Sequence, residues 1–126
     1  MSRTRLEPSP SHPITVTPTG ARVVVRVGGQ VVADTRDALT LREASYPPVQ
    51  YIPMADVDES VLRPSATTSY CPFKGEASYL SVAPAGQTAV EDAIWTYPEP
   101  YPAVAGIAGR AAFYPDRAEI TVLADG

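Results

Sequence analysis

The stretch "RVVVRVGGQVVADT", residues 22–35, carries the clearest local structural signal in the sequence. Residues 22–27 are rich in β-branched valine, which favours a strand, and residues 30–35 supply the return strand. Between them, Gly28 and Gly29 can adopt the positive φ angles that a tight hairpin turn requires. We therefore predict an antiparallel β-hairpin over residues 22–35.

Short extended segments continue on both sides of this hairpin. The segment "ITVTP", which begins at Ile14, alternates at period two, and the alternation of Leu39 and Leu41 favours a strand within residues 37–44. Prolines exclude a helix from residues 45–53, which we expect to be extended. Later strands are expected at residues 76–83 and 92–98, and residues 110–115 and 118–124 are expected to form a closing hairpin.

Residues 53–64 form the best helical stretch. Pro53 stands just before it, acidic residues occupy its first turn, and Pro64 ends it, so that it can hold about two turns. Six or more short strands with one minor helix predict a mainly β fold, a barrel or a sandwich.

Length, charge and hydropathy limit the classes of protein to consider. The 126 residues suit one domain, which we place at residues 14–126, after a flexible, proline-rich arm at residues 1–13. The net charge of −4 and the lack of a basic stripe argue against nucleic acid as a partner. No apolar run approaches the roughly 20 residues that span a bilayer, and no signal pattern opens the chain. We therefore expect a cytoplasmic protein with no membrane partner.

Cys71 and His12 are the single cysteine and the single histidine of the chain. They are too few for a structural zinc site, which usually takes four such ligands. One cysteine also excludes an intrachain disulfide, which suits a reducing cytosol. We expect no metal and no cofactor. A homodimer paired through an exposed edge strand is compatible with the sequence but nothing in it requires one.

Several blocks of the chain resemble, in order and spacing, the family catalogued as domain of unknown function 427. They are "YPPVQYIPMADV", "TSYCPFKGEASYLSV", "AIWTYPEP" and "IAGRAAFYPD", and the resemblance runs from about Val16 to Val122. The central block is carried by Thr67, Cys71, Pro72, Lys74, Gly75, Ala77 and Tyr79. The family has a threonine two residues before the cysteine, where this chain has Ser69.

This resemblance implies a β-tent-like fold, in which a pair of antiparallel sheets meets at an angle over a pocket, with one or two short helices. Many relatives in that fold hold zinc on two Cys-x-x-Cys knuckles, which this chain lacks, so we expect a tent without zinc, held by apolar packing. The family also carries a nucleotidyltransferase-like label. The chain has no Gly-Ser with paired aspartates on a strand, which metal-dependent nucleotidyl transfer would need to hold magnesium.

Cys71 has three interpretations. A nucleophilic cysteine needs a nearby cation or helix N-terminus to lower its pKa, and Lys74 could supply the cation if a turn folds it back. A histidine base is the usual companion, but His12 lies in the predicted arm. Cys71 could instead be a small buried residue at a strand end, or a residue that contacts a ligand.

Lys74 and Gly75 are the strongest candidates for ligand binding. Gly75 permits a positive φ or a close approach of the backbone, and Lys74 would project from the turn, where it could bind a carboxylate or a phosphate or simply face solvent. Large aromatic side chains in the predicted strands could be core, pocket wall or both. The candidates are Tyr51, Tyr79, Trp95 and Tyr97. Glu43 is expected to be a surface or ion-pair residue.

Three hypotheses about function follow. The first is a small-molecule-binding domain with a pocket between two sheets, whose ligand is polar or anionic. The second is an enzyme, which uses Cys71 and Lys74 or transfers nucleotidyl groups as the family label suggests. The third is a protein-interaction domain that uses an exposed sheet face.

Overall fold

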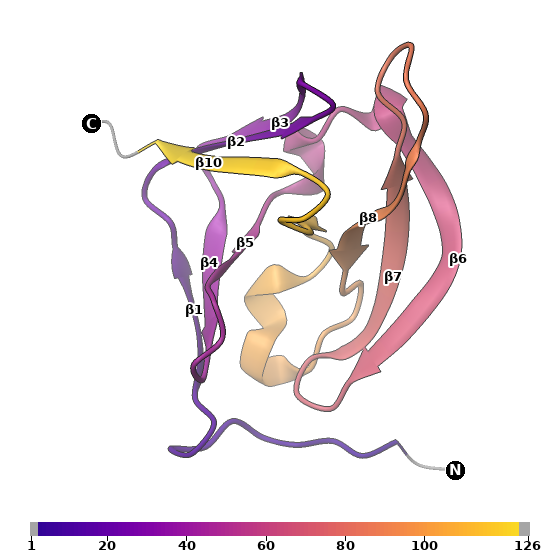
Figure 1. The fold of residues 1–126 in the computed structure, drawn as a ribbon. Coiled ribbons are helices and arrows are strands. Elements are labelled where there is room, and N and C mark those ends of the chain that lie inside the picture. The colour runs from indigo at the N-terminus through magenta and orange to yellow at the C-terminus, as the bar shows by residue number, and fades with distance from the viewer. Residues whose placement is uncertain (1–2, 124–126) are drawn as a thin grey trace.

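The computed structural model describes residues 3–123, which form ten strands and three short 3₁₀ helices (Figure 1). The strands are β1 (Ile14–Pro18), β2 (Arg22–Val27), β3 (Gln30–Thr35), β4 (Leu39–Glu43), β5 (Val49–Tyr51), β6 (Leu62–Cys71), β7 (Gly75–Val82), β8 (Val90–Thr96), β9 (Ala112–Phe113) and β10 (Glu119–Leu123). The 3₁₀ helices are η1 (Met54–Asp56), η2 (Glu59–Val61) and η3 (Pro102–Ile107). The predicted mainly β fold with short helices is confirmed.

The strands of residues 3–123 form three antiparallel sheets, where the resemblance implied a pair. Their orders are β1-β4-β5, β10-β2-β3 and β6-β7-β8-β9. The first and the last stand as two opposed walls, the second lies across their upper ends, and η3 lies between the walls (Figure 1). Backbone hydrogen bonds of 2.8 Å in both directions between Ile52 and Ala111 join the two walls where β5 ends and β9 begins.

The hairpin predicted over residues 22–35 is confirmed. Gly28 and Gly29 have φ of 57° and 79°, and the register pairs Val27 with Gln30 across the turn. The valines of β2 are buried, and Val23, Val25 and Val27 belong to the larger core cluster. The two glycines of the turn and the valine-rich strands therefore both favour this hairpin.

The closing hairpin predicted near the C-terminus is wrong, although its two strands exist. β9 pairs with β8, whereas β10 pairs with β2, with Ile120 opposite Val25. Between them, a turn closed by hydrogen bonds to the carbonyl of Tyr114 carries the chain from one sheet to the other. β10 thus completes the sheet that contains β2 and β3, and its Ile120 packs against the larger core cluster. Residue 124 lies outside the described residues.

The helix predicted over residues 53–64 is also wrong. Two single 3₁₀ turns, η1 and η2, are separated by the buried Val57, which is extended and forms a bridge with Ala33 of β3. Pairing with β3 satisfies this backbone and interrupts the helix. Pro64 lies inside β6, which is tolerated because β6 is at the edge of its sheet.

Replacement of Gly75 by alanine should destabilise the fold by about 1–3 kcal/mol, because residue 75 has a φ of +110°, which side chains other than glycine's rarely allow. Urea denaturation of Gly75→Ala measures the loss. Gly106→Ala is the matched control: its new Cβ would meet only ordinary contacts with side chains of Leu39 and Val16. An equal effect of both changes would contradict this explanation of Gly75.

Candidate functional site

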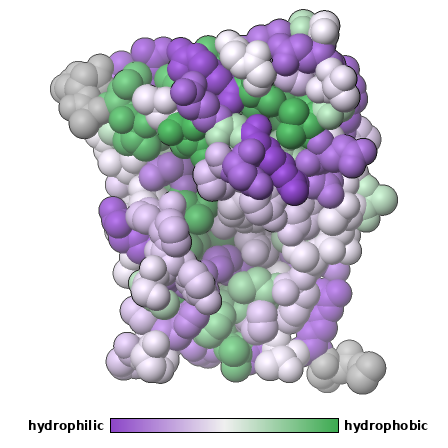
Figure 2. Space-filling model, viewed as in Figure 1, coloured by the Kyte–Doolittle hydropathy of each residue, from purple (hydrophilic) through white to green (hydrophobic). Residues whose placement is uncertain are grey.

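A cavity of about 230 Å³ lies between the two walls, and Figure 2 shows this face of the molecule hollowed below β10. Strand alternation explains its lining. Leu41 and Glu43 lie two residues apart on β4, so both face the cavity, and Tyr79 of β7 is directly opposite Trp95 of β8. The remaining lining residues are Tyr46, Pro47, Val49, Tyr51, Lys74, Tyr97 and Tyr114.

Most of the predicted ligand-binding residues meet at this cavity, namely Tyr51, Lys74, Tyr79, Trp95 and Tyr97. Gly75 and Cys71 lie outside its lining. Gly75 shapes the turn behind Lys74, with the carbonyl of Glu99 3.4 Å from where a Cβ would lie. Cys71 is half-buried and packs against the smaller core cluster, which consists of Leu41, Tyr51, Ala77, Tyr97, Val104, Ile107 and Ala112.

A polar cluster closes one end of the cavity. Lys74, only 7% exposed, donates to Oε1 of Glu43 and lies 3.7 Å from the sulfur of Cys71. The other carboxylate oxygen, Oε2, lies 2.7 Å from Nε2 of His12. Although burial raises the pKa of Glu43, hydrogen bonds from Lys74 and His12 outweigh it and hold that pKa below its ordinary value of 4.5. Both oxygens of Glu43 are therefore occupied by protein groups.

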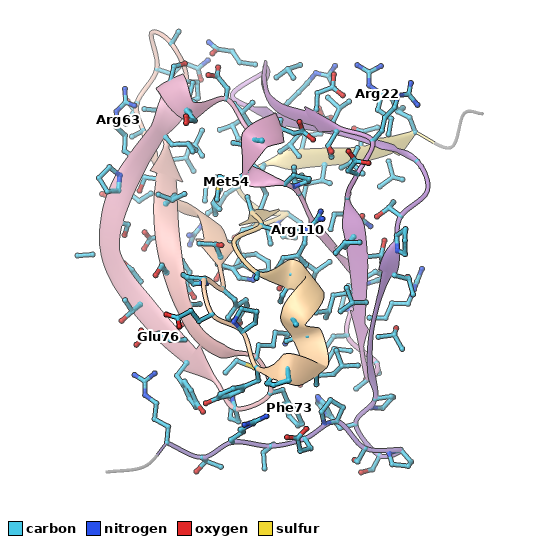
Figure 3. The ribbon with its side chains drawn as sticks, turned by 180° about the vertical axis from the view of Figure 1, so that it is seen from behind. Arg22, Met54, Arg63, Phe73, Glu76 and Arg110 are labelled. Carbon is cyan, nitrogen blue, oxygen red and sulfur yellow. The ribbon has the colours of Figure 1, made fainter. Side chains whose placement is uncertain are left out.

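His12 and Glu43 were not expected at the site. The ring of Phe73 stacks on the His12 imidazole with a centroid distance of 4.1 Å, and Figure 3 shows Phe73 beside the N-terminal arm. His12 and Glu43 are 31 residues apart in the sequence, so the residues around each of them do not indicate that the two side chains meet. The position of Glu43 two residues after the buried Leu41, on the same face of β4, was the signal that could have placed it inside.

The N-terminal arm crosses from the β6–β7 wall to the β1–β4 wall (Figure 1). The hydroxyl of Tyr70 donates to the carbonyl of Thr4 at 2.6 Å, and the amide of Leu6 donates to the carbonyl of Pro72 at 2.9 Å. These contacts bring the arm to the turn that carries Lys74. The flexibility predicted for the arm stays a prediction.

Three side chains that line the cavity, those of Lys74, Tyr51 and Tyr97, keep a hydrogen-bond donor that no described residue accepts. The hydroxyl of Tyr97 has no hydrogen-bond partner among residues 3–123. The hydroxyl of Tyr51 accepts from the Trp95 indole at 3.1 Å, and its own proton has no acceptor among those residues. Burial raises the pKa of both tyrosines, so they stay protonated and able to donate. The Lys74 ammonium has three donors, of which Glu43 and Cys71 take two.

Aromatic rings form the other side of the cavity. The ring centroids of Trp95 and Tyr114 are 4.5 Å apart, and the rings of Tyr114 and Tyr79 are nearly parallel. Burial, together with a 3.5 Å hydrogen bond to Tyr79, raises the pKa of Tyr114 to about 12. Ser69, where the family has threonine, keeps a hydroxyl that lies 2.8 Å from the hydroxyl of Tyr79. These aromatic side chains are therefore held in place by contacts with one another and with Ser69.

Within residues 3–123, no group of three or more His, Cys, Asp or Glu side chains is placed to hold a metal ion. In the same part of the chain, no helix is long and apolar enough to cross a membrane.

The lowered pKa of Glu43 makes a prediction about acid stability. A carboxyl whose pKa is lower in the folded state stabilises the fold above its ordinary value of 4.5, and this stabilisation is lost as the pH falls through the folded pKa. The unfolding free energy of the native protein should therefore fall more steeply as the pH drops below 4.5 than that of Glu43→Gln. Parallel curves from urea denaturation would show that Glu43 is not held in this way.

The chain was compared with known protein families. The family model described as a domain of unknown function, DUF427, with the label NTP_transf_9, matches residues 15–124. No curated protein matches the sequence.

Proposed function

We propose that this chain, which belongs to the DUF427 family, is a small-molecule-binding domain whose ligand is polar or anionic and lies in the cavity between the two walls. One observation carries the proposal: the hydroxyl of Tyr97, a residue only 7% exposed, lines the cavity and has no partner among the described residues. A ligand that accepts a hydrogen bond from this hydroxyl would gain an interaction typically worth about 0.5–1.5 kcal/mol.

The charges at the polar end favour a ligand that accepts hydrogen bonds. Glu43 neutralises Lys74 and has both oxygens occupied, so it offers little to a ligand that donates. Lys74, Tyr51 and Tyr97 each keep a donor, and a carboxylate, a phosphate or a carbonyl group could accept from them. The rings of Trp95 and Tyr79 would then contact the rest of the ligand.

We also propose that the protein acts in the cytoplasm, which the free thiol of Cys71 supports. The homodimer through an edge strand stays a prediction. β6, at one edge of its sheet, is the longest strand that could pair in this way.

A thermal-shift screen of small carboxylates, phosphates and nucleotides tests the binding function. A ligand at 100 times its Kd should stabilise the protein by about 2.7 kcal/mol, seen as a rise in Tm. Nucleoside triphosphates, with and without Mg²⁺, form a separate arm because the family label names nucleotide transfer. A shift with triphosphates and Mg²⁺ alone would favour the transferase, and no shift with any compound would contradict the binding proposal.

The variant Tyr97→Phe tests whether the hydroxyl of Tyr97 donates a hydrogen bond to the ligand. The change removes only the hydroxyl, so stability should stay within about 0.5 kcal/mol, whereas the affinity for the ligand should fall about 2- to 10-fold. Tyr70→Phe is the matched control, because the Tyr70 hydroxyl bonds to Thr4 and Tyr101, outside this cavity. Equal losses of affinity in both variants would remove the assigned role from Tyr97.

An enzyme that uses Cys71 is the second candidate. The observation in its favour is the contact between Nζ of Lys74 and the sulfur of Cys71, at 3.7 Å. Against it, Cys71 is half-buried and does not line the cavity. We therefore expect iodoacetamide to alkylate Cys71 at pH 7 no faster than a free cysteine. A rate about tenfold higher, abolished in Lys74→Met, would favour the enzyme.

A further inference from the structure

A second cavity of about 470 Å³ adjoins the first, and its chemistry is different. The residues that line only this cavity are Pro48, Gln50, Phe113, Pro115, Ile120 and Val122. Gln50 is the one polar side chain in that set, and its carbonyl oxygen is already an acceptor for Thr19 at 2.6 Å and for Thr40 at 3.2 Å. The second cavity is therefore an apolar chamber.

The two cavities share one boundary. Tyr46, Pro47, Val49 and Trp95 line both, so the polar chamber and the apolar chamber meet at Trp95 and at the segment between β4 and β5. Val122 is 45% exposed at the apolar chamber, and hydrophobic residues gather over the C-terminal part of β10 in Figure 2. Apolar surface left open to water beside a polar chamber suits a ligand that has both characters.

We infer that the ligand is a monocarboxylate with an apolar chain. Its carboxylate accepts hydrogen bonds from Lys74 and Tyr97 in the polar chamber, and its chain passes Trp95 into the apolar chamber beside Ile120 and Val122. This inference rests on the proposed function, because it assigns a ligand class to the same cavity. It adds the apolar chamber, which the proposed function does not use.

Straight-chain carboxylates from acetate to decanoate, each below the concentration at which it aggregates, test the inference. Trp95 is the only tryptophan of the chain and lies at the boundary, so its fluorescence reports binding directly. Affinity should rise about fourfold for each added methylene, which is the effect of burying about 0.8 kcal/mol of apolar group, and should level off once the chain fills the chamber.

Two valine variants test whether the apolar chain of the ligand lies in the apolar chamber. Val122→Gln should reduce the increase in affinity per methylene, whereas Val31→Gln should leave it unchanged, because Val31 is similarly exposed, at 49%, but lines neither cavity. Tyr97→Phe should weaken the whole series by one common factor and leave its dependence on chain length intact. If both valine variants weaken long chains equally, the chains bind elsewhere on the surface and the inference fails.

Failure of the inference and failure of the proposed function give different results. If short carboxylates or inorganic phosphate bind and added methylenes bring no gain, the apolar chamber is not part of the site, while the binding function stands. If no carboxylate binds but another compound of the screen does, the ligand class is wrong. If neither the series nor the screen gives any binding, the proposed function fails together with the inference.

Discussion

The ion pair between Lys74 and Glu43 is the interaction on which the candidate site depends. The two walls are joined at one end by the backbone bridge between Ile52 and Ala111, and at the other by this pair. The side chains of Lys74 and Glu43 are only 9% and 14% exposed. Loss of one partner would leave the other charge uncompensated in a poorly hydrated place, which typically costs about 3–5 kcal/mol. The pair thus sets the geometry of the cavity as well as its charge.

In the proposed function, the same pair favours ligands that accept hydrogen bonds. Glu43 receives Lys74 on one oxygen and His12 on the other, so the acceptor at the polar end is used within the protein. The remaining donor of Lys74 and the free hydroxyl of Tyr97 then face a cavity that has no acceptor for them among the described residues. In the proposed function, an acceptor on the ligand would complete this arrangement. The arm takes part as well, because it carries His12 to Glu43 and contacts the turn of Lys74 through Leu6.

Local chemistry made part of the fold predictable, and contacts between distant residues account for the rest. Gly28 and Gly29 between valine-rich runs define a hairpin without help from the remaining chain. The expected C-terminal hairpin fails because the choice of partner for β10 depends on the free edge of β2, about 95 residues earlier along the chain by the numbering. The helix over residues 53–64 fails because Val57 pairs with Ala33, which overrides a weak local preference.

Some residues of the candidate site could likewise be predicted from local sequence, and others could not. Tyr79, Trp95 and Tyr97 could be selected from the alternation of their strands, and all three line the cavity. His12 could not, since its role comes from a contact across 31 residues, and the alternation of β4 could place Glu43 on the inner face without identifying Lys74 and His12 as its partners. Gly75, expected beside a ligand, is needed by the turn that presents Lys74.

A double-mutant cycle between residues 43 and 74 tests most directly whether this pair holds the two walls together. The unfolding free energies of the native protein, Glu43→Met, Lys74→Met and the double variant would be measured in urea at pH 7. Our account predicts a coupling energy of about 1–3 kcal/mol, with the double variant more stable than the sum of the single losses implies. Additivity within about 0.5 kcal/mol would contradict it.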